Sequence, residues 1–150
     1  MARTQVNLGQ QDLAEGNLRR ALELDIDNLK AFQLLADIYL NRNDLDRALR
    51  QVNNLIKHDD ELPRYMLQKA VIYLRKNDSA SAERQFQRIE KAASDNPFVM
   101  RNLAKIRLDA GDIKGALANI KVAEKLAPDN LAVGLDYVWA HIADKNYQTA

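Results

Sequence analysis

Apolar residues recur along the chain with the spacing of amphipathic helices. In the segment 29–41, Phe32, Leu35, Ala36 and Tyr39 follow an i, i+3, i+4, i+7 pattern, which places them on one face of a helix. A second helix is predicted from about Leu45 to His58. Its inward positions are Leu45, Ala48, Leu49, Val52, Leu55 and Ile56.

Short polar turns separate the predicted helices. Asn43-Asp44 interrupts the apolar pattern, and similar pairs return at Asn77-Asp78 and Gly111-Asp112. Asparagine and glycine tolerate the left-handed backbone that ends a helix, and aspartate accepts hydrogen bonds from the free amides of the next helix. Weaker signals of the same type stand at Gly9-Gln10 and Lys145-Asn146. Helices joined by turns this short must lie antiparallel and touch.

Small residues recur at one fixed interval. One column consists of Ala14, Ala48, Ala82 and Ala116, and Ala150 continues it. A second column keeps the same interval and precedes the first within each unit; it consists of Ala36, Ala70 and Ala104. An interval of about 34 residues, held this strictly, predicts an array of one supersecondary unit. We expect the alanines to lie where paired helices cross.

The repeated pattern resembles that of the tetratricopeptide repeat (TPR) family. The third complete unit carries the resemblance most fully, through Met100, Leu103, Ala104, Gly111, Ala116, Ile120, Ala123 and Pro128. Lys69 departs from it where leucine is usual. In the last partial unit, Gly134 replaces a large apolar residue and Val138 replaces a small one.

The resemblance implies an all-α fold, a right-handed superhelical solenoid of antiparallel helix pairs. The single array would comprise a partial repeat at 1–28 (second helix), repeats at 29–62, 63–96 and 97–130, and a partial repeat at 131–150 (first helix and the start of a second). Both end helices would leave apolar faces uncovered, because terminal repeats need polar caps. We therefore expect self-association through the ends, and a larger parent protein.

The resemblance also implies a binding surface. In TPR arrays the first helix of each pair lines the concave face, and its outward residues are free for a peptide or protein partner. Carried over to this chain, the groove residues are Lys30, Gln33, Asp37, Arg64, Leu67, Gln68, Val71, Arg75, Phe98, Arg101, Asn102, Lys105, Leu135 and Trp139.

The groove residues combine apolar and basic side chains. Leu67, Val71, Phe98, Leu135 and Trp139 stand at positions that the core does not demand, among four basic residues. Aromatic anchors beside arginine are typical of protein-binding hot spots. The alternative is that these apolar residues pack against neighbouring turns and that the arginines keep the surface solvated.

Two known TPR activities fit the residues poorly. Co-chaperone TPR domains grip a C-terminal carboxylate with lysine, asparagine and arginine, but the corresponding residues here are Gln33, Asp37, Gln68, Phe98 and Asn102. The asparagine ladder of the O-linked GlcNAc transferase superhelix corresponds to Leu34, Gln68, Asn102 and Asp136, of which only Asn102 matches.

Residues for catalysis or metal binding are sparse. The chain has no cysteine, and its two histidines are His58, beside three acidic residues, and His141 on the last predicted helix. His58 is better interpreted as a solvated residue at a helix C-terminus than as a metal ligand, and His141 as an interface residue. The five glycines form no phosphate-binding motif. We expect no enzyme activity, metal or cofactor.

Charge and hydropathy argue against a nucleic-acid-binding protein and against a membrane-spanning protein. The net charge is +1, basic and acidic residues are evenly spread, and no apolar run approaches the length of a membrane span. The presumed groove has a net charge of about +2, which is small for a protein that binds a polyanion. We expect neither nucleic-acid binding nor membrane insertion, with RNA binding by helical repeats as a lesser alternative.

The sequence therefore predicts a non-catalytic scaffold that holds a peptide or helix of a partner protein. The short units with Asn-Asp turns look similar to TPR regions of bacterial assembly and polysaccharide-export lipoproteins, which would place the parent in the periplasm or outer membrane. A regulatory TPR region of a larger enzyme fits the same residues, and the cytoplasm fits the composition equally.

Overall fold

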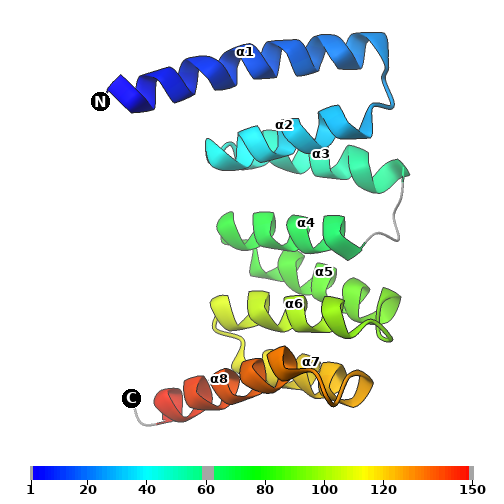
Figure 1. Ribbon diagram of the computed structural model, residues 1–150, viewed down its shortest axis with the longest axis vertical. Coiled ribbons are helices and arrows are strands. Elements are labelled where there is room, and N and C mark those ends of the chain that lie inside the picture. Colours follow the sequence, from blue (N-terminus) through cyan, green and yellow to red (C-terminus); the bar gives the residue numbers. More distant parts are fainter. Residues whose placement is uncertain (1, 59–62, 149–150) are drawn as a thin grey trace. The chain divides into compact units, whose positions relative to one another are not determined.

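The computed structural model describes residues 2–58 and 63–148, with side chains for 9–57 and 63–145. Within them the chain forms helices and no strand (Figure 1). The helices are α1 (Ala2–Leu24), α2 (Leu29–Asn41), α3 (Leu45–His58), α4 (Pro63–Arg75), α5 (Ser79–Ala92), α6 (Pro97–Asp109), α7 (Ile113–Leu126) and α8 (Leu131–Gln148).

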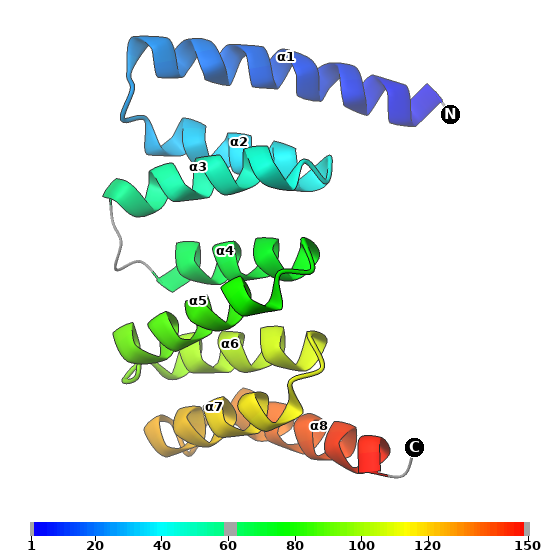
Figure 2. The same ribbon diagram turned by 180° about the vertical axis from the view of Figure 1, so that it is seen from behind.

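The chain divides into two units, Met1–Tyr65 and Met66–Ala150, with the boundary in the first turn of α4. Inside each unit, successive helices run in opposite directions, as the view from behind also shows (Figure 2). The predicted all-α array of helix pairs is therefore confirmed for the described residues. The division into repeats at 29–62, 63–96 and 97–130 stays a prediction.

The turns inside the helix pairs follow the predicted chemistry. Positive φ angles occur at Asn43 and Asn77, both 58°, and at Gly111, 81°. The aspartate that follows each of them accepts a hydrogen bond from an amide in the first turn of the next helix. The bonds run from Arg47 N to Asp44 at 3.1 Å, from Ser81 N to Asp78 at 2.9 Å and from Gly115 N to Asp112 at 3.0 Å.

Two other predicted turns are wrong. Helix α1 continues through Gly9 and Gln10, and α8 continues through Lys145 and Asn146. Neither pair has an aspartate to accept amides of a following helix, so nothing favours a break there. Ala150, which would extend the alanine column, lies outside the described residues.

Unit 1 has its core between α2 and its neighbours α1 and α3. The apolar face of α2 is buried as the periodicity predicts, and Ala48, Val52 and Leu55 of α3 are fully buried. Tyr39 is also buried, and its hydroxyl donates a hydrogen bond of 2.9 Å to Glu15 of α1. Arg42 reaches the same carboxylate at 2.7 Å. A polar contact thus accompanies the apolar packing of α1 on α2.

Unit 2 has one continuous core to which α4 through α8 all contribute. The small residues Ala70, Ala82, Ala104 and Ala116 are fully buried in it, as expected for residues at helix crossings. Alanine permits close approach of the two helix axes, because its side chain is a single methyl group.

Arg107 of α6 is an unexpected buried residue of unit 2. It lies at the position that tyrosine occupies one and two repeats earlier, at Tyr73 and Tyr39. Its guanidinium packs over the Phe86 ring, 4.6 Å from the centroid, and forms ion pairs with Glu83 at 3.2 Å, Glu90 at 3.0 Å and Asp112. Burial alone would lower the pKa of Arg107, but the hydrogen bond to Asp112 and the charges of Glu90, Glu83 and Asp112 raise it, so the guanidinium stays charged although it is buried.

Candidate functional site

The first helices of the pairs in unit 2 present a repeated row of aliphatic side chains outside the main core. Leu74 of α4, Leu108 of α6 and Ile142 of α8 occupy the same position in three successive repeats. Leu74 and Leu108 are half-buried and pack against the core cluster, whereas Ile142 is exposed. The spacing of 34 residues between these side chains is visible in the sequence, but the predicted groove residues did not include them.

A hollow of about 440 Å³ lies where α4 and α6 end. Aliphatic side chains form part of its wall, and an arginine and an aspartate stand among them. The lining residues are Val71, Leu74, Arg75, Asn77, Ser79, Ile106, Asp109 and Ala110. Two predicted groove residues, Val71 and Arg75, thus share a concavity that can take an apolar side chain beside polar groups.

Three of the predicted groove residues are large apolar side chains of α6 and α8 that are exposed to solvent. Phe98 is 68% exposed, Leu135 is 52% exposed and Trp139 is 65% exposed. They stand on helices whose opposite sides supply the buried residues Met100, Leu103, Val133 and Ala140. The prediction that the core does not demand these three positions is confirmed.

Leu67 differs from that prediction. It is half-buried and packs against the core cluster of unit 2. The expectation that its position is free of the core is therefore wrong, because the side chain of a residue on the flank of a helix can reach both the core and the surface. Gln68 and Asn102 are half-buried as well, and Lys105 is exposed.

Arg101 is held by an ion pair with Asp136 of α8. The Arg101 side chain is only partly exposed, and the Asp136 side chain is mostly buried. The pair joins the first helices of two neighbouring repeats, α6 and α8. Arg101 therefore positions α8 against α6, and its charge is already balanced.

The remaining predicted groove residues belong to unit 1. Lys30 and Asp37 of α2 are exposed, and Gln33 is half-buried. Arg64, in the first turn of α4, is exposed and lies over the Tyr65 ring, 4.4 Å from its centroid. Their assignment to a binding surface stays a prediction.

The described residues offer little for metal or membrane chemistry. No group of three or more histidine, cysteine or acidic residues among them could hold a metal ion. The side chain of His58 lies outside the described part, and the His141 ring packs edge-on against Tyr137, with centroids 4.4 Å apart. No described helix combines the length and apolar character needed to cross a membrane.

The comparisons with known proteins agree with this architecture. The sequence profile of the tetratricopeptide repeat matches residues 1–58 and again 34–97, together more than half of the chain. The chain belongs to the tetratricopeptide repeat family. The comparison with curated proteins gives no match.

Solved TPR structures share the fold at low sequence identity. TTC0263, a thermophilic TPR protein of Thermus thermophilus, is 22% identical, with a TM-score of 0.69 over 94% of this chain and 78% of that chain. PilF of Pseudomonas aeruginosa is 17% identical, with a TM-score of 0.65 over 95% of this chain and 65% of that chain. The first TPR domain of Spaghetti (RPAP3), bound to the HSP90 peptide SRMEEVD, is 15% identical, with a TM-score of 0.56 over 77% of this chain and 91% of that chain.

Proposed function

We propose that this TPR protein is a non-catalytic scaffold, and that the outward face of α4, α6 and α8 binds a segment of a partner protein. The observation that carries the proposal is the exposure of Phe98, Leu135 and Trp139 on helices whose other sides form the core. Exposed aromatic side chains give large contact area at low entropic cost, and they dominate binding energy at many interfaces.

The hollow between the ends of α4 and α6 adds a second anchor point. Val71, Leu74 and Ile106 suit an aliphatic side chain of the partner, and Arg75 and Asp109 suit polar groups next to it. RPAP3 shows that a TPR domain can hold a short peptide. The residues that would make a carboxylate clamp are missing here, so we expect an internal apolar segment rather than a free C-terminus.

We infer a larger parent protein. The short units with Asn-Asp turns look similar to TPR regions of bacterial assembly or polysaccharide-export proteins of the periplasm or outer membrane, and a regulatory region of a larger enzyme is equally compatible with the residues. The reading frame around these residues separates the two, since an upstream lipoprotein signal supports the first and a catalytic domain supports the second. RNA binding is a lesser alternative, and self-association stays a prediction.

Peptide selection tests the proposed groove. Peptides are selected from a random library on the whole chain, and their affinities are measured by fluorescence polarisation. Replacing Phe98 and Trp139 together by alanine should weaken binding about tenfold or more, because two aromatic anchors are lost. Ile26→Ala is the matched control, since Ile26 is an exposed apolar residue of unit 1 outside the groove set.

Each other outcome has a defined meaning. Equal affinity of the double variant and the wild type would place the binding surface elsewhere and contradict the proposal. Binding of a single-stranded RNA that weakens steeply with added salt, without any selected peptide, would favour the nucleic-acid class instead.

A further inference from the structure

One repeat position carries three different side chains on the first helices of unit 2. Val71 of α4, Lys105 of α6 and Trp139 of α8 follow one another at the 34-residue period of the array. Because the three helices are equivalent elements of successive repeats, these side chains stand at the same height along their helices. Together Val71, Lys105 and Trp139 form what is called here the cross-helix row.

The helices that carry the cross-helix row are neighbours. Helices α4 and α6 share the walls of the hollow of about 440 Å³, to which Val71 and Ile106 both contribute. Helices α6 and α8 pack on one another and are joined by the ion pair of Arg101 and Asp136. The row therefore runs from the hollow to the exposed indole of α8, with the ammonium group of α6 between them.

Lys105 supplies the uncompensated charge of the row. Its side chain is exposed and makes no hydrogen bond or ion pair with any described residue. Arg101, one helical turn away, is already paired with Asp136. Arg75 and Asp109 both line the hollow, and their opposite charges leave no net charge there. A negatively charged group placed opposite Lys105 therefore gains an ion pair without displacing another one.

The spacing of the row matches that of an extended chain. Neighbouring packed helices lie about 8–10 Å apart, so the members of the row follow one another at roughly that interval. A chain in the polyproline II conformation returns to the same side after about three residues and 9 Å. Every third residue of such a chain can therefore face one member of the row.

We propose that the partner segment is an extended chain in which an acidic residue has an apolar residue at the third position on each side. One apolar side chain enters the hollow beside Val71, the carboxylate pairs with Lys105, and the other apolar side chain packs on Trp139. This inference rests on the proposed function, because it names the class of segment that the same face binds. It does not involve Phe98, which lies about 10 Å from Lys105 along α6.

Two peptide pools test the charge pattern. Every peptide has a leucine or phenylalanine at each end, a fixed central residue, and two random residues on each side of the centre. The central residue is glutamate in one pool and lysine in the other, and both pools are displayed on phage and selected on the whole chain. We expect the glutamate pool to be enriched about tenfold or more over the lysine pool, because only glutamate pairs with Lys105.

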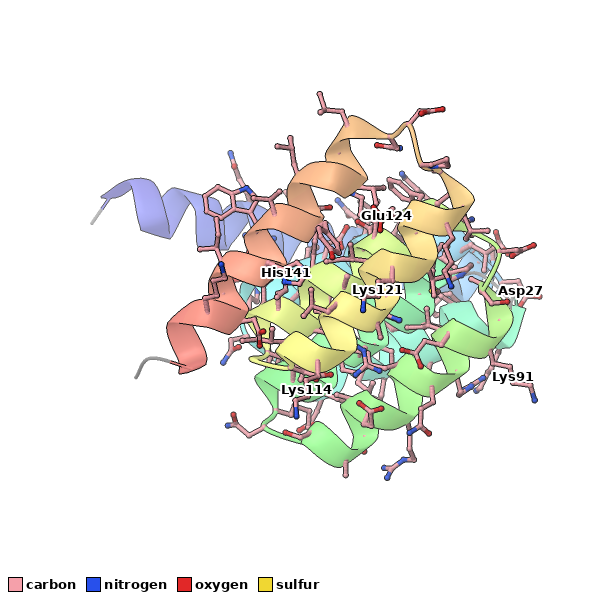
Figure 3. The ribbon with its side chains drawn as sticks, turned by 90° about the horizontal axis from the view of Figure 1, so that it is seen from below. Asp27, Lys91, Lys114, Lys121, Glu124 and His141 are labelled. Atoms are coloured by element: carbon pink, nitrogen blue, oxygen red, sulfur yellow. The ribbon has the colours of Figure 1, made fainter. Side chains whose placement is uncertain are left out.

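Charge reversal in the protein identifies the contact. Lys105→Glu should reverse the preference, so that the lysine pool is enriched, and circular dichroism verifies that the variant folds. Lys91→Glu is the matched control, since Lys91 is an exposed lysine of α5. Figure 3 shows Lys91 well apart from α8. This control should keep the preference of the wild type for glutamate.

The opposing results separate this inference from the proposed function. Equal enrichment of the two pools, enrichment of neither, or a glutamate preference that Lys105→Glu leaves unchanged overturns the inference. The groove itself stands if peptides from the unbiased selection still lose affinity when Phe98 and Trp139 are both replaced by alanine. A preference that reverses with Lys105→Glu but is unaffected by that double replacement would place the segment away from the aromatic residues and overturn both proposals.

Discussion

Gly115 of α7 lies directly against the side chain of Arg107 of α6. A Cβ atom at position 115 would stand 2.6 Å from Nη1 and 2.9 Å from Cδ of Arg107, and it would also meet the Asp112 carboxylate that caps α7. Arg107 cannot easily move away, because it is packed on Phe86 and paired with carboxylates from two helices. The absence of a side chain at position 115 therefore allows the buried ion-pair cluster of unit 2 to form.

Gly115→Ala should destabilise unit 2 even though alanine favours a helix. We expect a loss of about 1–2 kcal/mol in the free energy of unfolding, because the added methyl displaces Arg107 or the Asp112 cap. Gly134→Ala is the control, since a Cβ there meets no atom within 4 Å and should stabilise by about 0.5–1 kcal/mol. Urea denaturation of both variants measures the difference, and equal effects would refute the packing argument.

Glu15 should make the stability of unit 1 depend on pH. Burial acts to raise the pKa of Glu15, but the hydrogen bond from Tyr39 and the charges of Arg19 and Arg42 outweigh it, and the pKa lies below its ordinary value of 4.5. A lowered carboxyl pKa gives stability that is present above pH 4.5 and is lost as the pH falls through the folded-state pKa.

Glu15→Gln should therefore cost about 1–2 kcal/mol at pH 7 and progressively less below pH 4.5. Denaturation curves at both ends of this range give the comparison. Glu23→Gln on the same helix, where the side chain is exposed, should have little effect at either pH. If the destabilisation by Glu15→Gln does not change with pH, the lowered pKa of Glu15 is not the source of the pH dependence.

Lys69 should be a site where unit 2 can be stabilised. It replaces the leucine of the repeat pattern, and burial together with the positive charge of Arg88 lowers its pKa. A lowered lysine pKa means that the unfolded state binds the proton more tightly, so the penalty is full at neutral pH and disappears as the pH rises past 10.5. Lys69→Met should raise the free energy of unfolding by about 0.5–1 kcal/mol at pH 7. Lys91→Met, at an exposed position, should not, and a destabilised Lys69→Met would count against this interpretation.

The backbone at Asn77 should favour glycine over alanine. Its φ of 58° lies in the left-handed region. A Cβ is unfavourable there, and asparagine and aspartate tolerate the conformation because their side chains can form local hydrogen bonds. Asn77→Ala should cost about 1 kcal/mol, whereas Asn77→Gly should be close to neutral. Thermal unfolding compares the two, and equal melting temperatures would show that the turn does not need this conformation.

The sequence-based prediction succeeded where local chemistry decides the structure. The turn at Asn43 combines a residue that tolerates positive φ with an aspartate that caps the next helix. Both features can be recognised in the sequence alone. At Gly9-Gln10 the residue that tolerates positive φ is present but the capping aspartate is not, and the helix continues. The periodic alanines were also informative, because a methyl side chain kept at the same place in every unit indicates a close helix crossing.

The side-chain partners across helices were harder to predict. Arg101 and Asp136 are separated by one repeat and one further position, which is the spacing of neighbours on adjacent first helices. Their ion pair could therefore be predicted by aligning the repeats. The burial of Arg107 had a weaker signal, since a basic residue in a tyrosine column is equally compatible with an exposed surface. Only the positions of Glu83 and Glu90 on α5 decide between the two.

Trp139 should report on groove occupancy. It is the only tryptophan of the chain, and its side chain is 65% exposed, so the free protein should show the emission of a water-exposed indole and strong quenching by acrylamide. A peptide that binds the groove should shift the emission to shorter wavelength and protect it from quenching, because the indole leaves water. A peptide that binds with micromolar or better affinity and leaves both signals unchanged would show that the face of α8 that carries Trp139 is not the binding face.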